Sequence, residues 1–131
     1  MKPQPAQRQG STADGAEAPD LNQDTKGTTI TFWHSMGGVN GEAMDYLVNK
    51  FNEENTDGIT VEAVYQGEYD DTINKLKSAQ IGNMGADLVQ IYDIGTRFMI
   101  DSGWVIPMQD MIDSEGYDVS DLEPNITAII Q

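Results

Sequence analysis

A histidine beside a serine is the first candidate for chemistry in this sequence. His34 and Ser35 are adjacent, and a serine hydroxyl near a basic nitrogen is what nucleophilic catalysis uses. Successive side chains of a strand point to opposite faces, so on a strand these two would not meet. The G-x-S-x-G pattern of a nucleophile elbow is absent. We favour a polar strand end, and a small hydrolase using His34 with a carboxylate is the alternative.

Three acidic residues lie close together further along the chain. Glu68, Asp70 and Asp71 could group carboxylate oxygens around a hard cation, or they could be solvated acids in the first turn of a helix. We favour the helix interpretation. The sequence therefore predicts no metal, no cofactor and no catalytic residue.

A glycine-rich loop, Gly37–Gly41, separates a β-branched run from a helical pattern. Backbone amides at such a helix N-terminus can cradle an anion, although the loop lacks the lysine and spacing of a P-loop. The next helix begins among acids that would repel a phosphate. We therefore expect an anionic group, if one is bound, to contact this loop.

Tyr69 and Asp93 each follow the end of a predicted strand. A tyrosine ring offers a face for stacking, and a carboxylate offers acceptors for hydroxyl groups. From residue type and position alone, a ligand role and a structural role are equally open for both.

The elements that would position these residues alternate between strand and helix. The predicted strands cover residues 28–33, 59–65 and 86–92, and the predicted helices pass through residues 44–51, 70–81, 95–101 and 108–114. Met44, Leu47, Val48 and Phe51 form one face of the first helix. The alternation predicts an α/β fold with a mostly parallel sheet flanked by helices. Ligands bind such sheets beyond the carboxyl ends of the strands.

The composition narrows the classes of function. The 131 residues include 22 Asp and Glu against 7 Lys and Arg, for a net charge of −15. Such acidity is unsuited to nucleic acid or an anionic membrane surface. No cysteine is present for a disulfide framework, and no stretch approaches the about 18 apolar residues of a membrane span. The length and the 38% of hydrophobic residues fit one domain with a lean core.

Residues 1–27 differ in composition from the rest of the chain. They hold three of the five prolines and a net charge of about −1, whereas residues 28–131 carry the remaining −14. They lack the apolar core of a signal peptide, and they offer too little apolar surface to offset the entropy lost on ordering. We predict a flexible, disordered linker at 1–27 and a binding domain at 28–131.

Four segments of the body resemble one family. They are Thr28–Met36, Phe51–Asn55, Tyr65–Tyr69 and Val89–Thr96. These segments resemble the amino-terminal part of the extracellular solute-binding proteins of ABC importers, family 1. The resemblance covers essentially all of residues 28–131. It implies the amino-terminal lobe of a periplasmic-binding-protein-like (class II) fold, and it implies that the chain is an incomplete fragment of a two-lobed protein.

The resemblance also implies where a ligand binds. Tyr69 and the acid at position 93 would line the ligand cleft, with further candidates at the end of the first strand, namely Trp33, His34, Gly37 and Gly38. The family pattern has Glu where this sequence has Asp93, so a hydroxyl contact there would be longer or mediated by water. An arginine for the phosphate would lie beyond residue 131.

The function that the resemblance implies is transport without catalysis. The protein would capture sn-glycerol 3-phosphate or a related glycerophosphodiester and deliver it to an ABC permease in the membrane; a sugar or oligosaccharide is the alternative ligand. We expect a monomeric, extracytoplasmic protein, lipid-anchored through its linker. The apolar end Ile126–Gln131 leads us to expect that the 131-residue chain is less stable than the parent protein.

Overall fold

The computed structural model describes residues 24–126. Within that range the backbone forms two compact units, one of residues 24–96 and one of residues 97–126. Most of the predicted linker and residues 127–131 of the apolar end lie outside the described residues, so these two expectations stay predictions.

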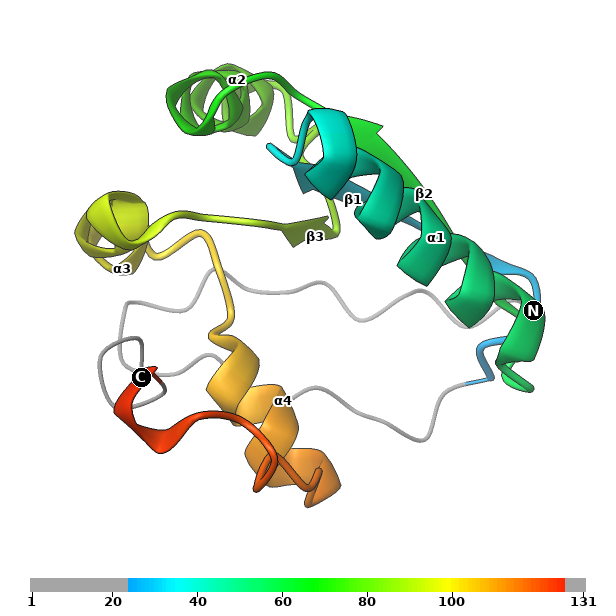
Figure 1. Cartoon of the computed structure of the whole chain (residues 1–131). Helices are drawn as coiled ribbons and strands as arrows, with labels where there is room; N and C mark the ends of the chain where they lie inside the picture. The colour runs from blue at the N-terminus through cyan, green and yellow to red at the C-terminus, as the bar shows by residue number, and fades with distance from the viewer. Residues whose placement is uncertain (1–23, 127–131) are drawn as a thin grey trace, which may run out of the picture. The chain divides into compact units, whose positions relative to one another are not determined.

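The first unit is built on a three-stranded parallel sheet. The strands are β1 (Thr28–His34), β2 (Ile59–Tyr65) and β3 (Leu88–Val89), and β1 lies between the other two (Figure 1). β-Branched and aromatic residues fill β1, and such side chains pack well on a pleated surface. In the observed register His34 lies opposite Tyr65, so the carboxyl ends of the two strands coincide. The predicted parallel α/β arrangement is confirmed.

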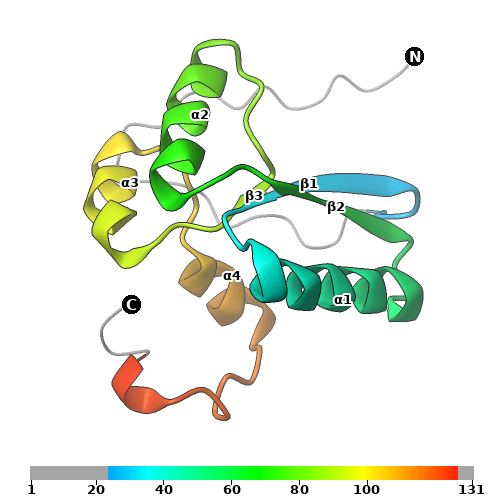
Figure 2. The same cartoon turned by 45° about the horizontal axis from the view of Figure 1, so that its top comes forward.

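Two helices flank this sheet. They are α1 (Gly38–Glu54) and α2 (Tyr69–Ile81), and Figure 2 shows α1 below the sheet and α2 above it, near the carboxyl ends of the strands. On α2 the apolar residues Ile73 and Leu76 are buried. On the predicted apolar face of α1, Met44 and Val48 are half-buried, whereas Leu47 is 59% exposed and Phe51 45% exposed.

The third strand is shorter than the sequence suggests. We predicted residues 86–92, and only Leu88–Val89 pair with β1. On one side Asp87 accepts the Thr31 N–H through its carboxylate at 2.9 Å. On the other side the Gln90 side chain accepts the Ser35 N–H at 3.0 Å. Side chains therefore take over the hydrogen bonds that a longer ladder would have supplied.

Two asparagines join α1 to β2. The Asn52 amide donates to the Val61 carbonyl at 3.0 Å and accepts the Val61 N–H at 2.7 Å. The Asn55 amide donates to the carbonyls of Phe51 and Ile59 and accepts the Ile59 N–H. Both asparagines belong to the segment Phe51–Asn55 of the family resemblance, and their role here is to satisfy exposed backbone groups at the helix end and along the strand edge.

The residues just before β1 are held to the turn that precedes β2. The Thr25 hydroxyl donates to the Asp57 carbonyl at 2.7 Å, and the Gly27 N–H donates to the Gly58 carbonyl at 3.0 Å. Gly58 has a positive φ of 72°, and a Cβ there would lie 2.9 Å from the Lys26 Cα. A glycine is therefore required where these two segments meet.

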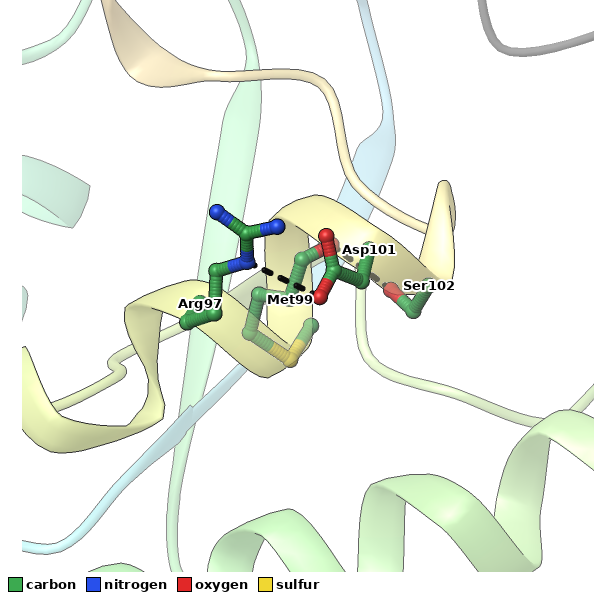
Figure 3. Close-up of polar contacts among 4 residues, drawn as sticks. All are labelled: Arg97, Met99, Asp101 and Ser102. Atoms are coloured by element: carbon green, nitrogen blue, oxygen red, sulfur yellow. Dashed lines mark hydrogen bonds and ion pairs between the residues drawn. The ribbon is translucent and has the colours of Figure 1, made fainter.

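The second unit contains short helices. After the 3₁₀ turn η1 (Asp93–Gly95) the chain forms α3 (Thr96–Ser102) and α4 (Met108–Glu115). Arg97 Nε donates to Asp101 Oδ2 at 2.9 Å, and the Ser102 hydroxyl donates to the Met99 carbonyl at 2.7 Å; Figure 3 draws both contacts. The ion pair is exposed, so it adds little stability. In the range 24–126 no helix has the length and apolar character needed to cross a membrane.

Candidate functional site

His34 is buried at the carboxyl end of β1. Only 2% of its surface is exposed, and its ring packs between Phe32 and Tyr65 at centroid distances of 5.5 and 6.0 Å. Nδ1 accepts the Met36 N–H at 3.2 Å, whereas Nε2 has no hydrogen-bond partner among the described residues. The Nδ1 acceptor implies that the neutral ring carries its proton on Nε2.

The neighbouring serine turns to a different partner. Ser35 Oγ lies 2.6 Å from Thr72 Oγ1 on α2, and both residues are buried. The serine hydroxyl is thus engaged with a threonine and not with the histidine beside it. This geometry agrees with the alternation of side chains along a strand and offers no support for a nucleophile and base at this position.

The glycine loop leads directly from β1 into α1. Gly37 is the N-cap residue of α1 in an extended conformation, and Gly38 has a positive φ of 56°. A Cβ on Gly37 would lie 3.2 Å from the Tyr65 hydroxyl oxygen, so the tyrosine packs closely over this glycine. No side chain caps α1, and its first turn has no acidic residue. Within residues 24–126, no side chain therefore supplies a capping carboxylate to the amides at the start of α1.

The start of α2 is different, because its own carboxylates cap it. Glu68 and Asp71 form a reciprocal capping box, in which Asp71 Oδ2 accepts the Glu68 N–H at 2.9 Å. Asp70 and Asp71 lie in the first turn, as predicted, where they favour the positive end of the helix. No group of three or more side chains able to hold a metal occurs in the described part of the chain.

Tyr69 and Asp93 are brought to the same end of the sheet. The Tyr69 ring stacks on the Tyr92 ring with centroids 4.9 Å apart and planes inclined by 3°. Tyr92 Oη donates to Asp70 Oδ1 at 2.5 Å, and this hydrogen bond raises the pKa of Tyr92 above its ordinary value. Asp93 follows directly, is exposed, and accepts the Ile94 N–H at 2.9 Å.

The candidate residues form two groups and one outlier. Tyr69 and Asp93 are linked through Tyr92, and His34 and Gly37 are linked through Tyr65. Gly38 follows in the same loop. Trp33 is half-buried in the central strand, and its carbonyl accepts the Gln90 N–H at 2.9 Å.

Sequence reasoning did not single out Tyr92, Thr72 or Gln90. Thr72 lies in the first turns of α2, and Gln90 and Tyr92 follow β3. Tyr92 bonds to Asp70, 22 residues away along the chain. Thr72 and Gln90 both bond to Ser35, at separations of 37 and 55 residues. No local pattern reports contacts over such separations.

The fold and the site together define a class of protein. A parallel α/β unit presents aromatic, glycine and carboxylate groups beyond its strand ends, where such sheets bind ligands. The parallel α/β unit fits the fold of periplasmic solute-binding proteins. The family model described as bacterial extracellular solute-binding protein matches residues 37–129, and the chain belongs to that family.

Curated relatives in the same family carry a more specific name. The chain is 34% identical over 103 residues to the sn-glycerol-3-phosphate-binding periplasmic protein UgpB of Escherichia coli strain K12. It has the same identity to the protein of that name in Shigella flexneri serotype 5b (strain 8401) and in Shigella dysenteriae serotype 1 (strain Sd197). Each alignment covers 76% of this chain and 23% of the relative. The chain thus matches less than a quarter of the length of these relatives.

Proposed function

We propose that this chain is the amino-terminal part of the substrate-binding component of an ABC importer. Its solute would be sn-glycerol 3-phosphate or a related glycerophosphodiester, and its partner would be a membrane permease. The observation that carries the proposal is the meeting of Tyr69 and Asp93 beside one stacked ring at the carboxyl end of the sheet. Family membership and the similarity to the sn-glycerol-3-phosphate-binding relatives support it.

The side chains of Tyr69 and Asp93 offer complementary contacts to such a solute. The Tyr69 ring, 38% exposed, presents apolar surface to the carbon chain of a polyol. The Asp93 carboxylate accepts hydrogen bonds from hydroxyl groups, directly or through water. Glu68, Asp70 and Asp71 flank Tyr69 in sequence, and Asp93 follows Tyr92, whose ring stacks on Tyr69. Because all four are acidic, this side of the site would repel a phosphate. The phosphate would contact the loop of residues 37–41 at the start of α1 and basic groups outside the chain.

The remaining parts of the proposal follow from the same role. Capture and delivery need no bond-breaking step, so we propose a binding protein and not an enzyme. We further propose an extracytoplasmic location, a flexible linker at 1–27 that leads to a lipid anchor, and a monomeric full-length protein. The sugar or oligosaccharide alternative uses the same Tyr69 and Asp93 contacts without a phosphate.

Ligand titration of the isotope-labelled 131-residue chain tests this function. We expect sn-glycerol 3-phosphate to shift the amide signals of Tyr69, Asp93 and residues 37–41. Glycerol alone should shift only the first two, and inorganic phosphate only the loop. A response to maltose but not to the glycerol compounds would favour the sugar alternative, and no response to any of them would contradict the proposal.

Two variants and one control locate the site. Tyr69→Ala and Asp93→Asn should each weaken binding about tenfold or more, since a lost hydrogen bond to a charged group or a lost stacking surface is worth roughly 1.5–3 kcal/mol. Tyr117→Ala removes a tyrosine that is 69% exposed in the second unit, and it should leave binding unchanged. Equal affinities for all four proteins would place the ligand elsewhere.

A further inference from the structure

We propose that Tyr92 is a positioning residue that sets the separation between the two ligand contacts Tyr69 and Asp93, with Asp70 holding Tyr92 in place. The consequence for ligand affinity rests on the proposed function. The positioning itself is a property of this chain alone and can be measured without any ligand.

Each of the two proposed ligand contacts is next in sequence to one partner of the Tyr92–Asp70 hydrogen bond. Tyr69 and Asp70 are consecutive at the start of α2, and Tyr92 and Asp93 are consecutive after β3. Two links join the pairs: the Tyr69 and Tyr92 rings stack at 4.9 Å, and Tyr92 Oη donates to Asp70 Oδ1 at 2.5 Å. Both links converge on Tyr92, so a displacement of that one side chain would disturb both pairs.

The planes of the two rings differ by only 3°, which is an offset parallel stack and not an incidental edge contact. One face of Tyr69 is therefore held against Tyr92, while 38% of Tyr69 remains exposed. A ring that is already held in place binds a ligand with a smaller loss of rotamer freedom than a mobile ring.

The hydrogen bond restrains Tyr92 from its other end. Asp70 lies in the first turn of a 13-residue helix, so its carboxylate is attached to a regular element. Asp70 and, more weakly, the adjacent Asp93 raise the pKa of Tyr92. Because the phenol stays protonated well into the alkaline range, it remains a hydrogen-bond donor at physiological pH.

Close packing at Gly95 supplies a third restraint on the Tyr92 ring. Gly95 is buried, and a Cβ built there would lie 3.1 Å from Tyr92 Cε1 and 2.7 Å from Ile73 Cδ1. Ile73 is itself buried on α2. The segment that carries Tyr92 is thus packed against α2 at a glycine, where a larger residue would require Ile73 or Tyr92 to shift.

Three substitutions separate the two links. Tyr92→Phe keeps the stack and removes the hydrogen bond, Asp70→Asn weakens the same bond from the other side, and Tyr92→Leu removes the stack. The primary measurement is the chemical shift of the Tyr69 ring protons in the 131-residue chain, since a stacked ring displaces these signals through its ring current. Tyr46→Phe is the matched control, because Tyr46 is 65% exposed on α1.

We expect Tyr92→Leu to move the Tyr69 ring signals to the values of a solvent-exposed tyrosine, and Tyr92→Phe and Asp70→Asn to move them partway. Tyrosinate titration should show the raised pKa of Tyr92 in the unaltered chain and in Tyr46→Phe. That group should disappear in Tyr92→Phe and return toward its ordinary pKa in Asp70→Asn. Unchanged Tyr69 signals in a folded Tyr92→Leu chain would overturn the proposal; should that variant not fold, unchanged signals and titration in Asp70→Asn would overturn it.

Affinity separates this inference from the proposed function. With sn-glycerol 3-phosphate as the probe, we expect Tyr92→Phe to weaken binding about threefold to tenfold, which corresponds to the loss of one hydrogen bond, and Tyr92→Leu to weaken it further. If the unaltered chain binds none of the test compounds, the proposed function fails, while the Tyr69 signals still decide the positioning. If binding is present but insensitive to both variants, the positioning has no role in recognition and the inference fails.

Discussion

Ser35 and Thr72 share a buried hydrogen bond, with their hydroxyl oxygens 2.6 Å apart. Ser35 is 9% exposed and Thr72 1% exposed, so neither hydroxyl has water as an alternative partner. The Ser35 N–H also donates to the Gln90 side chain at 3.0 Å. One serine therefore connects the end of β1 both to α2 and to the segment after β3, and these are the segments that carry the candidate ligand contacts.

This hydroxyl pair should be sensitive to the loss of one partner. Thr72→Val preserves shape and leaves the Ser35 hydroxyl buried without a partner, so we expect a loss of about 1–3 kcal/mol in the free energy of unfolding. The double variant Ser35→Ala, Thr72→Val removes both hydroxyls and should lose less than the sum of the two single variants. Urea unfolding of the four proteins measures the coupling, and strictly additive losses would show that the pair is not coupled.

The Asn52 amide should contribute stability through both of its hydrogen bonds to Val61. Asn52→Ala removes a donor and an acceptor at 3.0 and 2.7 Å, and we expect it to destabilise the chain by about 1–3 kcal/mol. Asn49→Ala, on an exposed position of the same helix, controls for the higher helix propensity of alanine. Equal unfolding midpoints for the two variants would contradict this role.

Gly41 should not tolerate a side chain, whereas Gly82 should. A Cβ on Gly41 would lie 2.7 Å from the Met36 carbonyl oxygen, and backbone cannot move aside as a side-chain end can. We expect Gly41→Ala to cost about 1–3 kcal/mol, in the range of overpacked sites. At Gly82 the nearest atoms lie at 3.7 Å, so Gly82→Ala should change the free energy of unfolding little. Thermal unfolding of both variants checks the order.

The hydrogen bond from Tyr92 to Asp70 predicts a stability change at alkaline pH. The folded-state pKa of Tyr92 is raised above 10.0, chiefly by this bond. The stability it contributes is therefore present below the unfolded pKa of about 10 and is lost as pH rises through the raised pKa. The difference in unfolding free energy between the unaltered chain and Tyr92→Phe should shrink over that range. A constant difference would contradict the linkage.

The hydrogen bonds of Asp118 in the second unit should make stability depend on pH in the opposite direction, with a loss at acidic pH. Hydrogen bonds from Ser120, chiefly its backbone N–H at 2.9 Å, lower the pKa of the Asp118 carboxyl. The bonds therefore stabilise the fold above the ordinary pKa of 3.8 and lose effect as pH falls through the lowered pKa. Ser120→Ala keeps the backbone donor, so the pKa should return only partway, as measured by the carboxyl carbon signal during an acid titration. A complete return would make the side chain the main cause.

Local patterns predicted the element order of this chain correctly. The β-branched run at 28–33 and the helical spacing through residues 44–51 became β1 and α1, because each pattern reports which face of a single element is apolar. The same patterns overestimated β3. Its apolar run at 86–92 has the right composition, but the side chains of Asp87 and Gln90 take the hydrogen bonds that would have extended the ladder.

For the site, residue type and strand position left a ligand role and a structural role equally open for Tyr69 and Asp93, and only the family resemblance proposes them as ligand contacts. Neither source indicated that Tyr92 links the two residues, since the Tyr92–Asp70 bond spans 22 residues. His34 illustrates the same limit from the other direction. Its position suggested a ligand-facing group, and the structure places it 2% exposed among aromatic rings.

The sequence by itself determined the α/β class, the parallel connections and the absence of a nucleophile elbow, because these depend on short-range periodicity and motif. Only the tertiary structure decided which side chains meet. The pairs Ser35 with Thr72, Asn52 with Val61 and Tyr92 with Asp70 form because packing of α1 and α2 on the sheet brings distant backbone segments within hydrogen-bond distance. Hydrogen bonds require donor and acceptor within about 3 Å, and no pattern along the chain encodes that proximity.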